Sequence, residues 1–260
     1  MRVRVRVVRQ RGRSLGRRAL WTGGELLVTA GVVLLLLVVH QLWWTNREAR
    51  RGAEHQVQAL EREWGTPSAT AGPPAVPRSG SRVDGAGGTG PGGSGGGSRT
   101  TTLNGPPGAR TSQAYAVLSI PRLHLRVPIA EGVSKRNVLN KGYVGHYSGT
   151  QQAGEEGNFA LAGHRNTHGE PFRHLPSLRL KDSVQVETST AVYTYTVDQI
   201  LPRTSATDSG VIRPVPRSDA RPSYGYTRPG HYLTLTTCTP EFTSRYRMAV
   251  WGELTSTRPR

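Results

Sequence analysis

Cysteine is almost missing from this chain. Among 260 residues there is a single one, Cys238, so no disulfide can form within the chain. A lone thiol that lies outside the membrane invites oxidation and unwanted pairing, so a chain that keeps one is expected to use it. Cys238 is therefore a candidate functional thiol, and an inert buried cysteine is the alternative.

Lysine and acidic residues are scarce as well. Of the 34 basic residues only Lys135, Lys141 and Lys181 are lysines, and 17 acidic residues leave a net charge of +17. This balance indicates an anionic partner, such as lipid, wall polymer or nucleic acid, without distinguishing among them.

Metal-ligand spacing is also missing. No two histidines are spaced like a ligand pair with a third ligand nearby, so we expect neither a metal nor another cofactor. Five histidines are expected in solvated loops or at rims: His124, His146, His168, His174 and His231.

Charged residues are absent from residues 26–44, and so is any clear polar stripe. As a helix this run measures roughly 28 Å, close to the thickness of a bilayer's hydrocarbon core. A helix of a soluble core would normally show a polar side, and a signal peptide would end in a small-residue cleavage site. Because neither feature is found, we expect an uncleaved transmembrane anchor that ends with Trp43 and Trp44 at the membrane interface.

Basic residues are unequally distributed about this run. The segment before it, up to Arg18, contains many arginines and no acidic residue, whereas Arg47, Arg50 and Arg51 after it are interleaved with glutamates. The positive-inside rule therefore places residues 1–25 in the cytoplasm as a basic tail and the remaining chain outside the cell. As a membrane flank this tail needs no nucleic-acid partner, and none is expected.

We expect residues 45–112 to form a linker, and large apolar side chains are nearly missing from its part beyond residue 65. Residues 46–64 are polar and compatible with a short continuation of the anchor helix. From about residue 65 the composition is that of a disordered coil, which cannot offset its ordering entropy. Such a coil would span on the order of 35–40 Å and hold the folded domain off the membrane.

Short alternating apolar runs begin only beyond residue 112. Helical signal there is confined to pieces near residues 134–140 and 172–178. Residues 113–260 are expected to form one all-β domain, a barrel or sandwich of seven or eight strands. Seven runs predict strands by alternation and β-branched content: residues 114–120, 125–129, 157–164, 182–188, 191–201, 231–238 and 246–254.

Strand parity gives three of these runs a reactive group on the face opposite their bulky apolar residues. We expect that opposite face to be accessible, although parity does not place the three groups near one another. The apolar pairs and their reactive groups are Leu233 and Leu235 with Cys238, Phe159 and Leu161 with His164, and Met248 and Val250 with Arg247.

Cysteine, histidine and arginine can together carry out acyl transfer without a carboxylate. The histidine takes the thiol proton and later gives it to the leaving amine, while the cation stabilises the thiolate or the oxyanion. Cys238, His164 and Arg247 are the candidates for these roles. Arg245 shares the parity of Arg247 and is its main rival.

Several motifs resemble those of the sortase family. The sequence TLTTC at residues 234–238, followed by an arginine at the start of the next strand, resembles the sortase signature TLxTC…R. LAGHRNTHGEPF at residues 161–172 resembles the segment that carries the catalytic histidine. Together with GHYSGT at residues 145–150, these motifs are most similar to class E sortases of actinobacteria, and the resemblance covers roughly residues 115–254.

The resemblance implies a sortase-like closed β-barrel of about eight strands with short helices, preceded by the single transmembrane helix and the disordered linker. It implies a cysteine transpeptidase at the cell membrane. Secreted proteins would be cleaved between Thr and Gly of a C-terminal sorting signal, LAxTG-like or LPxTG-like. The acyl group would pass to an amine of a peptidoglycan precursor, anchoring the protein to the cell wall.

The resemblance also implies residue roles. Cys238 would be the nucleophile, His164 the proton shuttle, and Arg247 the residue that binds the signal and stabilises the oxyanion. Thr237 and Leu235 belong to the strand that lines the signal groove in the family, and Tyr147 would form a groove wall. Two departures, Thr239 where members often have Asn and Ser148 where they have Pro, bear on fine specificity.

Two other functions compete with this interpretation. Another cysteine enzyme of the wall, such as an L,D-transpeptidase, usually carries its cysteine in an S/T-H-G-C context, which the residues before Cys238 do not match. A non-enzymatic module that binds anionic wall polymer would explain the anchor, the linker and the charge. It would leave Cys238, His164 and Arg247 as coincidences.

Overall fold

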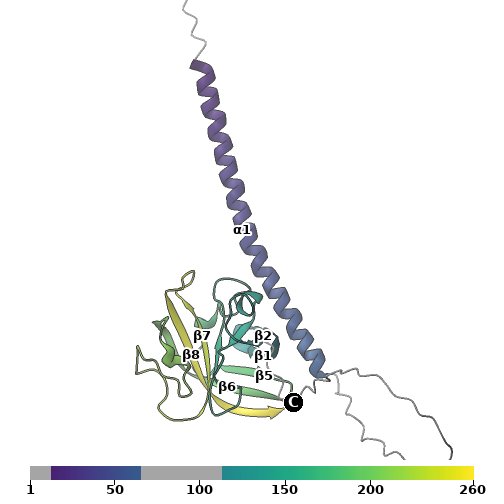
Figure 1. Ribbon diagram of the computed structural model, residues 1–260, viewed down its shortest axis with the longest axis vertical. Coiled ribbons are helices and arrows are strands. Elements are labelled where there is room, and N and C mark those ends of the chain that lie inside the picture. The colour runs from purple at the N-terminus through teal and green to yellow at the C-terminus, as the bar shows by residue number, and fades with distance from the viewer. Residues whose placement is uncertain (1–12, 66–112) are drawn as a thin grey trace, which may run out of the picture.

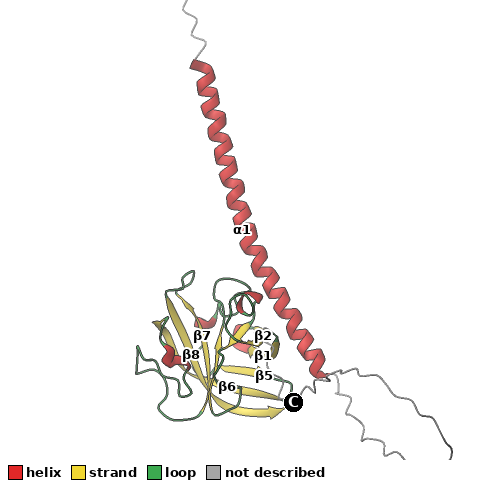
Figure 2. Ribbon diagram, in the orientation of Figure 1, coloured by secondary structure: helices red, strands yellow, loops and turns green. Residues whose placement is uncertain are grey.

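The computed structural model describes residues 13–65 and 113–260, which form one long helix and a closed β-barrel (Figures 1 and 2). The predicted barrel is confirmed. Its strands follow the order β1-β2-β3-β4-β7-β8-β6-β5 around the barrel. The elements are α1 (Arg13–Gly65), β1 (Ala114–Ile120), β2 (Leu125–Glu131), β3 (Val144–His146), β4 (Gly157–Ala162), β5 (Ser183–Glu187), β6 (Ala191–Ser205), β7 (His231–Thr239) and β8 (Tyr246–Pro259).

Strand β3 is the element that the sequence pattern did not reveal, because three residues are too few to show alternation. It pairs in parallel with β2 and antiparallel with β4, and so closes the barrel. The expected helical pieces are only single 3-10 turns, η2 (Leu139–Lys141) and η3 (Leu175–Ser177). Strands β6 and β8 run beyond their predicted ends because they pair with each other from Ala191–Pro259 to Ser205–Tyr246.

The main core lies inside the barrel, and the parity prediction for its lining is confirmed. The six apolar residues assigned to the inner faces of the three reactive strands all belong to this core: Phe159, Leu161, Leu233, Leu235, Met248 and Val250. A buried leucine or phenylalanine side chain contributes about 1.5–3 kcal/mol of transfer free energy, so this lining fixes which face of each strand points inward.

The outer face of β7 and β8 is not open along its length, so the expectation of an accessible opposite face is wrong for most of it. Residues 206–230, which connect β6 to β7, cover it. Trp251 and Val211 pack there in a second apolar cluster, and the Trp251 indole donates to the Val211 carbonyl at 3.1 Å. Thr234 is buried there and donates to the Val211 carbonyl at 3.3 Å.

A carboxylate holds this covering loop in place. Asp208 is buried and accepts hydrogen bonds from the hydroxyls of Thr204 and Ser218 and from the backbone N–H of Asp219, the last at 2.9 Å. A buried carboxylate is stable only when its lone pairs are satisfied in this way.

The C-terminal part of α1 packs against the barrel, as Figure 1 shows. Ala53, Val57 and Leu60 recur at helical spacing on one face and are buried in a third cluster, together with residues of β1, β2 and the 138–143 segment. The part of the expected linker that precedes residue 66 is therefore a docked helix. Residues 66–112, the expected disordered coil, lie outside the described residues.

The apolar run of α1 is exposed, as a membrane span would be. The helix contains an 18-residue window of mean hydropathy 2.3, long and apolar enough to cross a membrane, and none of that window is buried in the protein. It is a candidate membrane anchor. Most of the basic tail before it, residues 1–12, lies outside the described part.

We predict that Asp208→Asn loosens the covering loop. Burial raises the pKa of Asp208, but hydrogen bonds from Ser218, Thr204 and the backbone outweigh burial and leave the pKa lowered. The carboxylate therefore stabilises the fold above its unfolded pKa, and this contribution is lost as pH falls through the lower folded pKa. The variant should lower the free energy of unfolding by about 1–3 kcal/mol at neutral pH, and by less in acid.

Urea unfolding of the variant and the unaltered protein, at neutral and at acid pH, measures the loss of stability at each pH. Asp219→Asn is the control, because Asp219 is about half exposed and pairs with Arg213 at the surface. Equal losses for Asp208→Asn at neutral and acid pH would contradict a role for the charged carboxylate.

Candidate active site

Cys238 and Arg247 are direct partners across the β7–β8 ladder. Cys238 is paired with Arg247 in an antiparallel register, and directly paired residues extend on the same face of a sheet. Both side chains are half-buried, so each is accessible at the end of its strand. The Arg247 guanidinium donates from Nη1 to the carbonyls of Ser244 at 2.8 Å and Tyr246 at 2.9 Å.

Arg245, the rival arginine, lies outside this ladder. It comes just before β8 begins at Tyr246, and its side chain is exposed. Its guanidinium stacks over the Tyr246 ring, 5.3 Å from the centroid. The strand register therefore brings Arg247, and not Arg245, to the thiol.

His164 comes to the same end of the barrel from the other side of β7. Strand β4 runs parallel to β7, with Ala162 level with Thr236. The pairing continues past the strand, since Gly163 donates to the Thr236 carbonyl at 3.1 Å and the Thr237 hydroxyl donates to the Gly163 carbonyl at 2.8 Å. His164, the next residue, is thus level with Cys238.

Arg165 ties the histidine segment to the cysteine segment. Its Nη1 donates to the Thr239 hydroxyl at 3.1 Å and lies 3.4 Å from the Cys238 carbonyl oxygen. Sequence reasoning did not assign it a role, although it belongs to the quoted LAGHR motif. Its contacts hold β7 and the loop after β4 in register where the reactive groups lie.

Asn140 holds the imidazole of His164. The Asn140 side-chain oxygen accepts from His164 Nε2 at 2.9 Å, so in this arrangement Nε2 carries the proton and Nδ1 is left as the basic nitrogen. Asn140 lies 24 positions before His164 in η2, and no motif marked it. Only the tertiary structure shows this contact.

The His164 side chain is neutral at neutral pH. Burial, together with charge repulsion from the nearby His168 and Lys135, lowers its pKa to about 4. The rings of His164 and His168 have centroids 5.5 Å apart. A neutral imidazole with one free nitrogen can accept a proton, which is what a general base requires.

Tyr147 reaches β7 beside the thiol. Its hydroxyl lies 3.0 Å from the Thr236 hydroxyl, and Thr236 itself donates to the Leu161 carbonyl at 3.1 Å. Tyr147 therefore donates to Thr236, two residues before Cys238. Its ring is half-buried, and its role as a groove wall stays a prediction.

Thr237 and Leu235 do not present side chains to solvent. Leu235 is 1% exposed and belongs to the main core, and Thr237 is 3% exposed with its hydroxyl bonded to Gly163. Both support the strand that carries Cys238. Direct contact of either side chain with a substrate does not agree with this burial.

His146 is not a solvated residue, and that expectation is wrong. It is 1% exposed and lies in strand β3, which the sequence pattern did not reveal. Its Nδ1 lies 2.7 Å from a Glu131 carboxylate oxygen, and its Nε2 lies 3.1 Å from the Gln151 carbonyl. His168 is half-buried, while the exposure expected for the others is confirmed: His124, His174 and His231.

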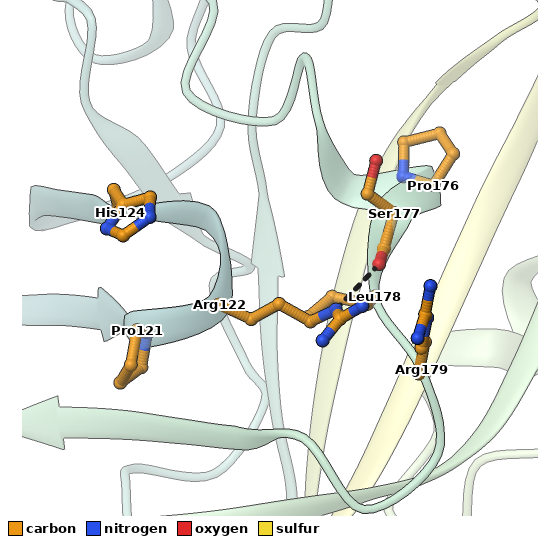
Figure 3. Close-up of a pocket in the computed structure, with 7 residues that line it drawn as sticks. All are labelled: Pro121, Arg122, His124, Pro176, Ser177, Leu178 and Arg179. Carbon is orange, nitrogen blue, oxygen red and sulfur yellow. Dashed lines mark hydrogen bonds between the residues drawn. The ribbon is translucent and has the colours of Figure 1, made fainter.

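A surface hollow of about 670 Å³ lies away from these groups (Figure 3). It lies between the turns at Pro121–Leu123 and Leu175–Ser177, and Arg122 bridges it by donating to the Ser177 carbonyl at 3.1 Å. None of its lining residues belongs to the candidate site. Within residues 13–65 and 113–260 no group of three His, Cys, Asp or Glu side chains could hold a metal ion.

A closed eight-stranded barrel that carries a thiol, an imidazole and a guanidinium at the ends of three neighbouring strands has the design of a cysteine transpeptidase. The sortase domain family matches residues 118–255. Sortase SrtE1 of Streptomyces coelicolor is 41% identical over 242 residues, which cover 91% of this chain and 57% of that relative. Sortase SrtE2 of the same organism is 34% identical over 96% of this chain and 87% of its own length.

Solved structures agree with this match. Sortase E1 of Streptomyces coelicolor, crystallised with a tripeptide in its active site, is 49% identical with a TM-score of 0.54, over 57% of this chain and 92% of that one. Sortase E of Streptomyces avermitilis is 45% identical with a TM-score of 0.50, over 56% and 90%. The chain belongs to the sortase family, whose members are cysteine transpeptidases.

We predict that the His164 imidazole titrates far below an ordinary histidine. Its pKa of about 4 means that the unfolded chain takes up a proton near pH 6.5 that the folded chain refuses. Stability should therefore fall as pH drops from about 6.5 to 4, and His164→Gln should remove part of this fall. NMR titration of the histidine ring protons, assigned with the same variant, measures the pKa directly.

Lysine substitutions test the cause of the shift. Lys135→Ala should raise the pKa of His164, because it removes a nearby positive charge. Lys181→Ala, another exposed lysine that does not contribute to the shift, should leave it unchanged. A His164 pKa near 6.5 in the unaltered protein would show that the ring is not buried as described.

Proposed function

We propose that this chain is a membrane-anchored cysteine transpeptidase that cleaves a C-terminal sorting signal and transfers the acyl group to a peptidoglycan precursor amine. The observation that carries the proposal is the register of β7, which pairs Cys238 directly with Arg247 and brings His164 level with it. The chain spans about 57% of the length of one curated relative, SrtE1, so the activity of the whole protein is part of the proposal.

The first half-reaction follows from the protonation state of His164. Its free Nδ1 takes the proton of the Cys238 thiol, and the sulfur bonds to the threonine carbonyl carbon of the signal. The Arg247 guanidinium stabilises the oxyanion that forms. The bond from threonine to glycine then breaks, and the imidazolium gives its proton to the leaving glycine amine.

The second half-reaction reverses these roles. The acceptor amine attacks the thioacyl carbon and loses a proton to His164. The sulfur leaves, and the thiol regains its proton from the imidazolium. Proton and leaving group balance in each half, so the three side chains suffice without a cofactor.

Substrate choice rests on the groove beside β7. Tyr147 forms the wall there through its bond to Thr236, and an LAxTG-like signal fits the class E resemblance better than LPxTG. The tripeptide in the active site of the Streptomyces coelicolor relative supports a peptide ligand at this position. Client proteins are secreted, since we place the barrel outside the cell and residues 1–25 in the cytoplasm on the basis of the arginine-rich tail.

Replacing the nucleophile should stop the reaction without unfolding the barrel. Cys238→Ala should abolish release of the glycine-containing fragment from an LAxTG peptide, as measured by mass spectrometry. Because Cys238 is half-buried at a strand end, we expect the melting temperature to change little. Wild-type turnover in this variant would exclude the thiol mechanism.

The two arginines should differ sharply. Arg247→Ala should lower kcat by about 10²–10³, the usual loss when an oxyanion donor is removed, whereas Arg245→Ala should stay near wild type. Arg245 serves as the matched control because it lies two residues away and stacks on Tyr246 outside the ladder. A larger loss for Arg245→Ala would transfer the role to that residue.

A further inference from the structure

Two loops that hold His164 both touch α1 just after its apolar run. One is the segment that leaves β4 and carries His164 itself, and the other is the turn that carries Asn140. Asn46 and Arg50 of α1 reach the first loop, and the backbone of Ala49 reaches the second. The helix therefore contacts both the loop that carries His164 and the turn whose Asn140 bonds the imidazole.

The first loop is bound to α1 by four hydrogen bonds. Asn46 accepts from the Gly169 N–H at 3.3 Å and donates to Glu170 Oε1 at 2.9 Å. Arg50 donates from Nε to the Gly169 carbonyl at 3.0 Å and from Nη2 to Glu170 Oε2 at 2.9 Å. Both polar groups of Gly169 and both carboxylate oxygens of Glu170 are thus fixed by the helix.

This loop has an unfavourable backbone of its own. His168, Gly169 and Glu170 follow one another with φ of 51°, 84° and 53°, all in the left-handed region. Two of the three are not glycine, and such residues cost free energy unless their surroundings hold them. Glu170 already has an ion pair with Arg173 of the same loop, so the helix is not needed to neutralise its charge. The helix contacts instead fix where the loop lies.

The second loop meets α1 backbone to backbone. A Cβ on Gly142, whose φ is +80°, would lie 2.7 Å from the Ala49 carbonyl oxygen. A Cβ on Gly169 would lie 3.3 Å from the Cα of Gly142 and 3.4 Å from the nitrogen of Arg50. Three chain segments therefore converge at one point, two residues from Asn140, which holds the His164 ring.

We propose that Asn46 and Arg50 are positioning residues, and that docking of α1 sets the geometry of the catalytic histidine. The inference rests on the proposed role of His164. Arg50 lies six residues after Trp44, or about 9 Å along the helix, so the same segment joins the membrane anchor to the His164 loop. Loss of the helix contacts frees the strained loop and the Asn140 turn together, and the imidazole loses its orientation.

The experiment uses the full chain in lipid nanodiscs. Arg50→Ala and Asn46→Ala should each lower kcat on an LAxTG peptide by about tenfold with little change in KM, since a small misplacement of a catalytic group acts on the chemical step. The NMR-measured pKa of His164 should rise as the ring becomes hydrated, and the pH profile of Cys238 alkylation by iodoacetamide should shift with it. Arg50→Lys keeps the positive charge but loses the planar guanidinium that donates two hydrogen bonds at once. It should recover part of kcat.

Arg51→Ala is the matched control. Arg51 is an exposed arginine on the next position of the same helix, and its loss should leave kcat and the His164 pKa at wild-type values. If Arg50→Ala fails to fold, Asn46→Ala decides the question, because it removes one small side chain. Wild-type kcat and wild-type His164 titration in Asn46→Ala and in any folded Arg50→Ala would overturn the positioning role.

Cys238→Ala separates this failure from failure of the proposed function. If that variant is inactive while the positioning variants behave as wild type, only the role of α1 is refuted. If it still cleaves the peptide, the thiol mechanism itself is refuted. The His164 titration and the alkylation profile do not require a known signal peptide, so they test the helix contacts in either case.

Discussion

The hydrogen-bonding register of strand β7 is the constraint on which the candidate site depends. On one side β7 pairs in parallel with β4 and so brings the His164 segment to its end, and on the other it pairs antiparallel with β8 and brings Arg247. Leu233 and Leu235 lock this register, since a slip of one residue would turn them out of the core and turn Cys238 inward. The packing of the barrel interior thus determines the geometry of the chemistry outside it.

Partial burial sets the exposure of the site and the protonation state of its histidine. The loop held by Asp208 and Trp251 covers the outer face of β7 at Thr234, and Tyr147 contacts that face at Thr236. The strand is half-buried from Cys238 onward. The same partial burial lowers the pKa of His164, so that the ring is neutral where a thiol proton must be accepted. A fully solvated histidine, with a pKa of about 6.5, would be a stronger base but partly protonated near neutral pH.

Helix α1 joins the candidate membrane anchor to this arrangement. Its apolar run is a candidate anchor, and the next turns pack on the barrel through Ala53, Val57 and Leu60. The described contacts place the barrel beside the helix, so residues 46–65 do not act as a free spacer. This brings the His164 loop close to the end of the candidate anchor.

The sequence alone determined the features that are encoded locally. Alternation identified the inward residues of β4, β7 and β8, the uncharged run identified the anchor candidate, and the motifs selected Cys238, His164 and Arg247. Tertiary structure alone decided that Arg247 lies directly across the β7–β8 ladder from Cys238, that Asn140 holds the imidazole, and that His146 is buried. A strand's two faces follow from neighbouring residues, whereas register and loop contacts join residues far apart in the chain, and no local pattern records which of them meet.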